Sequence, residues 1–182
     1  SADGTKLVAV VFDGQIYTST TSGTSWTPRE SSRNWFSVAS SSDGAKLVAV
    51  VESGQIHTST DSGVTWTPQA SIGKCYSVAS SADGTKLVAG VNGGQIYLSN
   101  DSGITWTPRG SVLPWYAVAS SADGTKLVAG AYGGQIYTSS PATTTPGTAG
   151  YLLGGQKTAI ELQYIGNGQF LPLSHEGAFS AY

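Results

Sequence analysis

The sequence predicts an all-β protein in which a sheet of four short antiparallel strands is repeated along the chain. The segment Ser59–Trp66 (Ser-Thr-Asp-Ser-Gly-Val-Thr-Trp) returns 40 residues later as Ser99–Trp106, and a related segment, Ser19–Trp26, stands 40 residues earlier. Asp-Gly pairs, which favour tight hairpin turns, separate apolar runs in each repeat. No stretch shows helical periodicity. Four strands in a 40-residue repeat are typical of β-propeller blades.

The first three strands of each repeat follow from its apolar runs. The first strand is residues 35–40 (Trp-Phe-Ser-Val-Ala-Ser), with copies at 75–80 and 115–120. After an Asp-Gly turn, the second strand begins at Lys6, Lys46, Lys86 and Lys126. This strand is almost continuously apolar, so we expect both of its faces to be buried. A glycine-containing turn then leads to the third strand, residues 15–19 and its copies.

The three eight-residue segments, which we call the octets, are predicted to form the turn before the fourth strand. The aspartate can accept backbone N–H bonds, the glycine can take a positive φ, and the tryptophan can pack beneath the turn. These structural residues are Asp61, Gly63 and Trp66 in one octet and Asp101, Gly103 and Trp106 in the next. Thr21 replaces the aspartate in the first octet, so we expect that turn to be less well fixed. We also expect loss of an octet tryptophan to destabilise the fold more than loss of Trp35.

The octet pattern resembles the Asp-box, the S-x-D-x-G-x-T-W motif of BNR-type, sialidase-like β-propellers. The resemblance covers residues 1–140, and two of the three octets match the motif fully. In those families the Asp-box is a structural turn remote from the active site, so the resemblance implies a fold and not a chemistry. Propellers of this kind include glycosidases, lectin-like binders and assembly factors of photosynthetic complexes.

The chain is predicted to have three parts. Residues 1–140 form propeller repeats, with blade units starting near residues 1, 41, 81 and 121. Residues 141–158, rich in Thr, Pro and Gly, form a connector. Residues 159–182 form a β-hairpin that docks on the repeats, because residues 159–165 alternate apolar and polar side chains and Asn167-Gly168 is a hairpin turn. We expect residues 159–173 to pair with repeat strands, and deletion of residues 147–182 to give an aggregating or unfolded product.

The sequence leaves two arrangements of the blades open. The two tail strands can complete a four-bladed ring of four-stranded sheets, or the repeats can form an open segment that another chain completes. The chain contains no methionine and starts inside a repeat, so we expect it to be a processed or cut piece of a longer protein.

Composition excludes several classes of partner. The formal net charge is −2 and 11% of the residues are charged, so no basic patch is available for nucleic acid. No apolar run approaches the ~18 residues of a membrane span, so we expect no membrane insertion. The single cysteine, Cys75, excludes an intrachain disulfide and a cysteine metal cluster. We expect no metal and no cofactor.

The repeats differ from one another mainly at one end of the blades, which we call the varied end. It consists of the turns between the second and third strands and the connections between repeats. The opposite, uniform end consists of the Asp-Gly turns and the octets. The varied end carries Phe12, Arg29, Arg33, Trp35, Glu52, Lys74, Tyr76, Asn92, Arg109, Trp115, Tyr116 and Tyr132.

Aromatic rings with a few polar neighbours suit a small polar ligand, above all a sugar. The predicted ligand-binding residues are Arg29, Trp35, Arg109, Trp115, Tyr116 and Tyr132. The alternative is that Trp35 and Trp115 pack between blades and that the loops vary because variation is tolerated there.

No pattern of catalytic residues is recognisable. A sialidase needs three arginines on the substrate carboxylate and a Tyr–Glu pair, but Arg29 and Arg109 are equivalent positions of two repeats and no such pair is identifiable. Six of the eleven acidic residues stand in turns, and the others share no motif for two facing carboxylates. His57 replaces a tyrosine of the other repeats, and the pair His175-Glu176 fits an exposed loop end better than a metal site or a base. We therefore expect no enzyme activity.

The sequence predicts a non-catalytic extracellular binding module, with carbohydrate as the favoured ligand at the varied end. The alternative is a structural or self-assembling surface or filament protein whose tail docks on a neighbouring chain. The expected partners are a glycan or another small polar ligand, or further copies of the chain in a homo-oligomer. Abundant Ser, Thr and Gly with little Lys suit a secreted protein, so we expect an extracellular or cell-surface location.

Overall fold

The structure is a computed structural model that describes residues 1–139, 152–154, 159–166, 169–176 and 179–181. Every regular element in these ranges is a β-strand, and every strand pair is antiparallel. The predicted all-β fold of blade-type sheets is therefore confirmed. Within the same ranges no helix is long and apolar enough to span a membrane.

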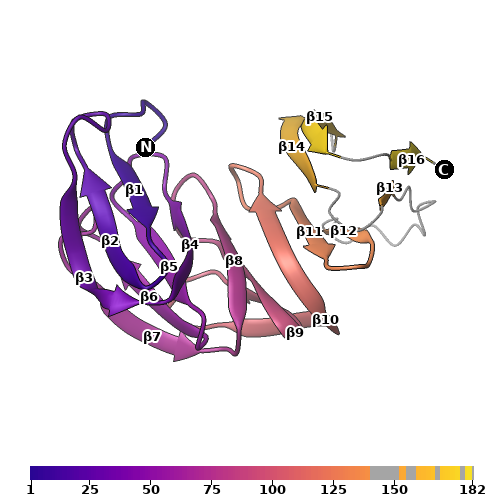
Figure 1. Cartoon of the computed structure of the whole chain (residues 1–182), viewed down its shortest axis with the longest axis horizontal. Coiled ribbons are helices and arrows are strands. Elements are labelled where there is room, and N and C mark those ends of the chain that lie inside the picture. The colour runs from indigo at the N-terminus through magenta and orange to yellow at the C-terminus, as the bar shows by residue number, and fades with distance from the viewer. Residues whose placement is uncertain (140–151, 155–158, 167–168, 177–178, 182) are drawn as a thin grey trace.

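The first two repeats form separate sheets with the strands side by side in chain order (Figure 1). The first sheet contains β1 (Leu7–Val10), β2 (Gly14–Ser19) and β3 (Thr27–Arg33). The second contains β4 (Trp35–Ser40), β5 (Leu47–Val51), β6 (Gln55–Ser59) and β7 (Thr67–Ser71). The second sheet thus has all four predicted strands of a blade in the predicted order.

The last two repeats share a five-stranded sheet because two strands run on through a predicted turn. The sheet contains β8 (Cys75–Ser80), β9 (Leu87–Ser99), β10 (Thr107–Ser120), β11 (Leu127–Ala131) and β12 (Ile136–Ser139). β9 covers the predicted second and third strands of the third repeat. β10 covers the fourth strand of that repeat and the first strand of the next, and it pairs with β9 and then with β11.

The core lies between neighbouring blades. One buried cluster joins Ile16 of the first sheet to Trp35, Ala49 and Val51 of the second. Another joins the second sheet to the third repeat through Val48, Val50, Ile56, Cys75, Val78, Leu87 and Ala89. Every residue of β5 is buried, as predicted for a strand with neighbours on both faces. The sheets therefore stabilise one another by burying apolar area between them.

Backbone hydrogen bonds confirm the two ends of the blades. At the uniform end the octet meets the Asp-Gly turn of its own repeat, since the N–H of Ser62 donates to the carbonyl of Ala45 (2.9 Å) and that of Ser102 to Thr85 (2.9 Å). At the varied end the turn after the second strand meets the connection between repeats, since the N–H of Tyr132 donates to the carbonyl of Pro114 (2.8 Å).

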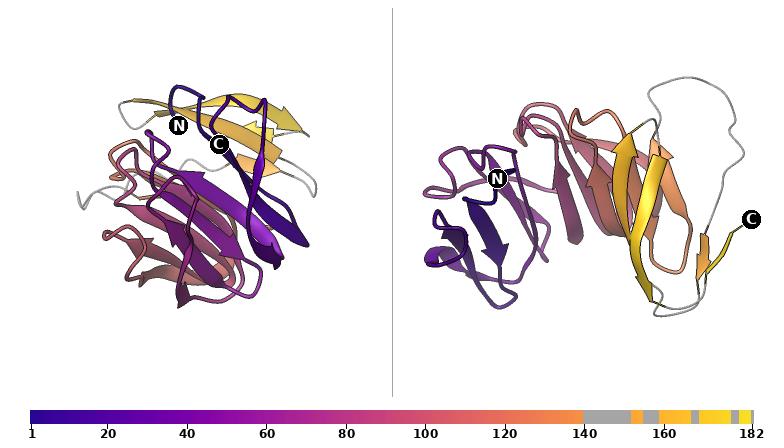
Figure 2. Two further views of the ribbon diagram at one scale, coloured as in Figure 1. Left: turned by 90° about the vertical axis from the view of Figure 1, so that its left-hand side faces the viewer. Right: turned by 90° about the horizontal axis from the view of Figure 1, so that it is seen from above.

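The sheets of the repeats form an open row, with β1–β3 at one end and β11–β12 at the other (Figures 1 and 2). The tail contributes β13 (Leu152–Gly154), β14 (Ala159–Gly166), β15 (Gln169–Glu176) and β16 (Phe179–Ala181). The predicted hairpin is confirmed, because β14 pairs with β15.

Within one chain, the predicted pairing of residues 159–173 with repeat strands is not found among the strands that the structure describes, and pairing with a neighbouring chain stays a prediction. β14 and β15 form a sheet of their own, and β13 pairs with β16. The tail hairpin therefore does not close a ring of blades by strand pairing. Apart from β13, the predicted connector 141–158 lies outside the described residues. Completion of the row by another chain stays a prediction.

Candidate functional site

The octet turns are held by a repeated set of side-chain hydrogen bonds at the uniform end. The Asp61 carboxylate accepts the backbone N–H of Thr65 (2.9 Å) and the hydroxyls of Thr65 (2.6 Å) and Ser59 (2.8 Å). The indole Nε1 of Trp66 donates to the carbonyl of Gly63 (3.1 Å), whose φ is +83°. Asp101, Gly103 and Trp106 repeat this arrangement in the next octet. These residues form a structural turn, as predicted.

Hydrogen bonding keeps the turn aspartates ionised. The hydroxyl of Thr65, and after it the backbone N–H, lowers the pKa of Asp61 to about 2. Thr105 does the same for Asp101, whose pKa is also lowered to about 2. In the Asp-Gly turns the Ser1 hydroxyl and the groups of Thr5 lower the pKa of Asp3 to about 2. A carboxylate that accepts several hydrogen bonds is stabilised in its charged form.

The first octet keeps the same turn with a neutral acceptor. The Thr21 hydroxyl accepts the backbone N–H of Ser25 (2.9 Å) and contacts the Ser25 hydroxyl at 2.9 Å. Trp26 is 42% exposed. Hydrogen bonds to a charged acceptor are stronger than those to a neutral one, so this turn is held less strongly than the other two.

Two of the predicted ligand-binding residues are core residues. Trp35 is 1% exposed and Trp115 is 2% exposed, so neither ring is accessible to a ligand. The Trp35 indole donates to the carbonyl of Ser31 (3.4 Å) and packs edge to face on His57 with ring centroids 5.0 Å apart. Trp115 packs in the same way on Tyr137. Their prediction as ligand-binding residues is therefore wrong, because both rings are buried. The alternative, packing between blades, is confirmed for Trp35, which shares a cluster with Ile16 of the first sheet.

The two predicted arginines lie away from the predicted tyrosines. Arg29 is on β3, the outermost strand of the first sheet, and its Nε donates to the Thr18 hydroxyl (3.1 Å). Arg109 is on the first half of β10, which is the outermost strand of the third repeat, and it is exposed. Tyr116 is on the second half of β10, which begins the fourth repeat. The structure therefore does not gather the predicted site into one place.

The structure instead brings five aromatic rings into a continuous row at the varied end. Along this aromatic row the ring centroids of successive neighbours are 5.6, 4.6, 4.9 and 5.3 Å apart, in the order Phe12, Phe36, Tyr76, Tyr116 and Tyr132. Phe12, Phe36, Tyr116 and Tyr132 are 57%, 37%, 49% and 65% exposed. Two predicted site residues, Tyr116 and Tyr132, are thus adjacent members of a larger exposed feature.

The packing of the first strands creates the row. Phe36, Tyr76 and Tyr116 occupy one position in three repeats, on β4, β8 and β10. The backbone N–H of Val78 donates to the Ser37 hydroxyl (3.2 Å), and that of Val118 donates to the Ser77 hydroxyl (3.1 Å). These bonds join neighbouring first strands, so rings 40 residues apart in sequence come into contact. The aromatic residue that recurs at this position is the feature of the sequence from which the aromatic row could have been predicted.

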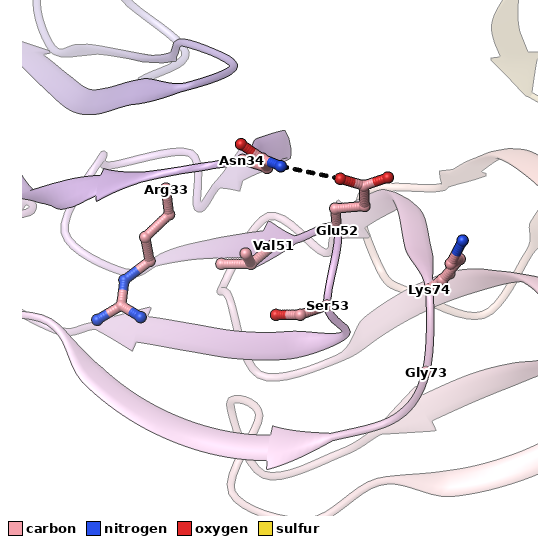
Figure 3. A pocket seen from close by; sticks show the side chains of 7 residues that line it. All are labelled: Arg33, Asn34, Val51, Glu52, Ser53, Gly73 and Lys74. Carbon is pink, nitrogen blue, oxygen red and sulfur yellow. Dashed lines mark hydrogen bonds between the residues drawn. The ribbon is translucent and has the colours of Figure 1, made fainter.

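A shallow depression of about 570 Å³ lies at the same end of the second blade (Figure 3). It is lined by Arg33, Asn34, Val51, Glu52, Ser53, Gly73 and Lys74. The Asn34 amide donates to the Glu52 carboxylate (2.9 Å), and both residues are among those that line the depression (Figure 3). Of the side chains that the structure describes, no three His, Cys, Asp or Glu residues are grouped so that they could hold a metal ion.

No family model and no curated protein matches the chain. Among solved structures the fold is similar to "YCF48 bound to D1 peptide", with a TM-score of 0.62, 21% identity and 79% of this chain covered. It is also similar to YCF48 from Cyanidioschyzon merolae, with a TM-score of 0.60, 17% identity and 76% of this chain covered. The chain spans 50% of the length of each of these two proteins.

A further match is the GH74 enzyme of Niastella koreensis, with a TM-score of 0.49, 24% identity, 74% of this chain covered and 22% of that one. The YCF48 structures are β-propellers, so the comparison supports the blade architecture of the described repeats.

Proposed function

We propose that this chain is a non-catalytic binding module that holds an extended polypeptide segment along the aromatic row. The row itself is the observation that carries the proposal. Rings on one exposed surface of a soluble protein mark an interaction site when they are contiguous, whereas scattered exposed rings do not. The varied end presents such a surface across all four repeats.

The packing within the row favours a polypeptide over a sugar. Phe36 and Tyr76 are stacked, with an interplanar angle of 14° and centroids 4.6 Å apart, so each covers one face of the other. Tyr116 has a neighbouring ring on each side as well. A sugar binds aromatic residues mainly through free ring faces, whereas the apolar side chains of a peptide can pack on ring edges. The central part of the row therefore suits side chains of a peptide.

The structural comparison is consistent with this ligand class. One of the similar propellers is YCF48 bound to a D1 peptide. At 21% identity the similarity is one of fold. It supports the proposal that blades of this kind can present a surface for a peptide. It does not indicate the sequence of the peptide.

The acidic residues support a non-catalytic role. A general acid or base works best with a pKa near the working pH, and active sites raise the pKa of carboxyl groups to reach it. The aspartates with shifted pKa in this chain have it lowered, and hydrogen bonds within turns are the cause. They act as turn residues at the uniform end.

An array of octapeptides covering apolar, basic, acidic and polar sequences tests the proposal. We expect binding that Tyr116→Ala and Tyr132→Ala each weaken by about tenfold, which corresponds to ~1.4 kcal/mol for loss of a contact ring. Trp26→Ala is the matched control, because Trp26 is an exposed ring at the uniform end. Equal loss of binding in Trp26→Ala, or no peptide bound by the wild-type chain, would overturn the proposal.

Carbohydrate is the second candidate ligand, and the two ends of the row favour it. Phe12 and Tyr132 each have a neighbour on one side only and are the most exposed members of the row, at 57% and 65%. Each therefore has a ring face on which a sugar can stack. A glycan array followed by titration calorimetry tests this candidate, with Tyr132→Ala expected to abolish the signal.

The remaining predictions from sequence are kept as proposals. The hydrogen bonds of the octets support membership of the Asp-box type of propeller repeat. Self-assembly through the tail and an extracellular location are proposed on the sequence alone. Mass measurement in solution over a range of concentrations tests self-assembly, since a head-to-tail contact makes the mean mass rise with concentration.

A further inference from the structure

Glu52 occupies the position in the second repeat that Phe12, Asn92 and Tyr132 occupy in the others. Its backbone is held in the same way as that of Tyr132, because the N–H of Glu52 donates to the carbonyl of Asn34 (2.9 Å) and the N–H of Tyr132 donates to Pro114 (2.8 Å). The strand pairing beneath is also the same, with Val51 opposite Trp35 and Ala131 opposite Trp115. The two side chains therefore leave equivalent points of the scaffold.

By this equivalence the Glu52 side chain is expected beside the aromatic row. In the fourth repeat the turn residue Tyr132 contacts the first-strand residue Tyr116 of its own repeat. In the first repeat the turn residue Phe12 contacts the first-strand residue Phe36 of the next one. In the second repeat, the first-strand residue of the same repeat is Phe36 and that of the next repeat is Tyr76. Glu52 is therefore expected beside these two residues, which form the stacked pair at the centre of the row.

We propose that Glu52 and the stacked pair Phe36–Tyr76 form a subsite for a lysine or arginine side chain of the bound polypeptide. The proposal rests on the proposed function and specifies one residue of its ligand. The methylene chain of a lysine or arginine can pack on the exposed edges of the two rings, and the Glu52 carboxylate supplies the charge opposite to its cationic end. Glu52 is held ready for this contact, since the Asn34 amide orients its carboxylate through one oxygen and leaves the other for a ligand.

Arg33 and Lys74 line the same depression as Glu52, and among the described residues neither forms an ion pair with it. The Arg33 guanidinium points away from the Asn34–Glu52 pair (Figure 3). Lys74 is exposed and belongs to the connection that supports the turn of the third repeat, where its carbonyl accepts the N–H of Asn92 (2.8 Å). We therefore expect Lys74→Gln to leave the affinity for a basic peptide unchanged or to strengthen it.

The test uses octapeptides of one apolar sequence with a single central residue that is lysine, glutamine or glutamate. Binding to the full chain is measured by titration calorimetry. We expect the lysine peptide to bind about two- to fivefold more tightly than the glutamine peptide, and the glutamate peptide to bind most weakly. Free butylammonium is expected to bind too weakly to detect, because it lacks the apolar contacts along the row.

Glu52→Gln removes the charge and keeps an oxygen that can accept the Asn34 amide, so we expect the fold to be retained. This variant is expected to bind the lysine and glutamine peptides equally. Glu30→Gln is the matched control, since Glu30 lies on the outer strand β3, and it is expected to keep the wild-type preference. Asn92→Asp places a carboxylate at the equivalent turn of the third repeat and is expected to increase the preference for lysine.

The outcomes separate the two proposals. If the peptides bind but Glu52→Gln leaves the preference for lysine unchanged, the subsite is wrong and the peptide-binding function stands. A preference for the glutamate peptide would likewise overturn the subsite and point to Arg33 and Lys74. If no peptide binds, both proposals fail, and binding of a glycan in the array would then replace them.

Discussion

At the scale of single residues, the turns were predictable because their hydrogen bonds are local. Asp61 bonds to residues within four positions along the chain, so the order Ser-x-Asp-x-Gly-x-Thr contains all the groups involved. The burial of Trp35 was only one of two alternatives left open by the sequence, because its neighbour His57 is 22 residues away and belongs to the same blade only through strand pairing. Cys75 at the equivalent position of the third repeat suggested that the Trp35 ring was dispensable. Ile72 packs against the buried cluster that contains Cys75.

The charge of the octet aspartate can be introduced into the first octet. We expect Thr21→Asp to raise the urea midpoint at pH 7, because a carboxylate replaces a hydroxyl as the acceptor for Ser25. A carboxyl whose pKa is about 2 in the folded state, as for Asp61, and about 3.9 in the unfolded chain stabilises above about pH 4. The gain should therefore disappear as the pH falls from 4 to 2. A gain that persists at pH 2 would contradict this explanation.

The two kinds of tryptophan are expected to differ in the opposite sense to the prediction from sequence. Trp35→Ala should lower the free energy of unfolding by about 3–5 kcal/mol, because the ring is fully buried between blades. Trp66 is only partly buried against the same cluster, so Trp66→Ala should cost less. Urea denaturation of both variants decides the order, and a larger loss for Trp66→Ala would restore the original prediction.

At the scale of elements, the strands follow from local patterns and the aromatic row follows from their packing. The sequence placed Tyr116 and Tyr132 at the varied end, and the two rings do meet. It did not single out Phe36, because an alternating strand gives no indication of which face meets the next blade. That depends on the hydrogen bonds between first strands, made by Ser37 and Ser77.

The turn at Gly54 shows how closely two elements approach at the varied end. A Cβ on Gly54 would lie 2.0 Å from the backbone carbonyl oxygen of Gly73, and its φ is +87°. We expect Gly54→Ala to cost about 1–3 kcal/mol for overpacking and about 1–2 kcal/mol more for the positive φ. Gly134→Ala, at the same repeat position, is the control, because the nearest atom to its Cβ would be the Ala131 Cβ at 3.2 Å. Equal thermal shifts for the two variants would contradict the close approach.

At the scale of the whole molecule, blade architecture was predictable and ring closure was not. A 40-residue repeat requires each sheet to bury its faces against neighbours, so the stacking of blades follows from periodicity. Counting strands suggested that the tail completes a blade, but a strand count says nothing about partners. The two strands of the tail hairpin pair with each other, with Ala159 opposite Glu176 and Tyr164 opposite Phe170.

The role of the tail can be decided by truncation. Because the described tail strands pair only with one another, deletion of residues 147–182 removes no partner from β11 or β12. We therefore expect the truncated chain to unfold cooperatively at an unchanged melting temperature, in contrast to the aggregation predicted from sequence. Deletion from residue 132 onward is the control: it removes β12, which pairs with β11 through Leu127 and Ser139, and it should lower the melting temperature. If deletion of residues 147–182 alone makes the chain insoluble, the tail covers the edge strands of the outer sheets. Uncovered edge strands expose unpaired backbone groups and favour aggregation.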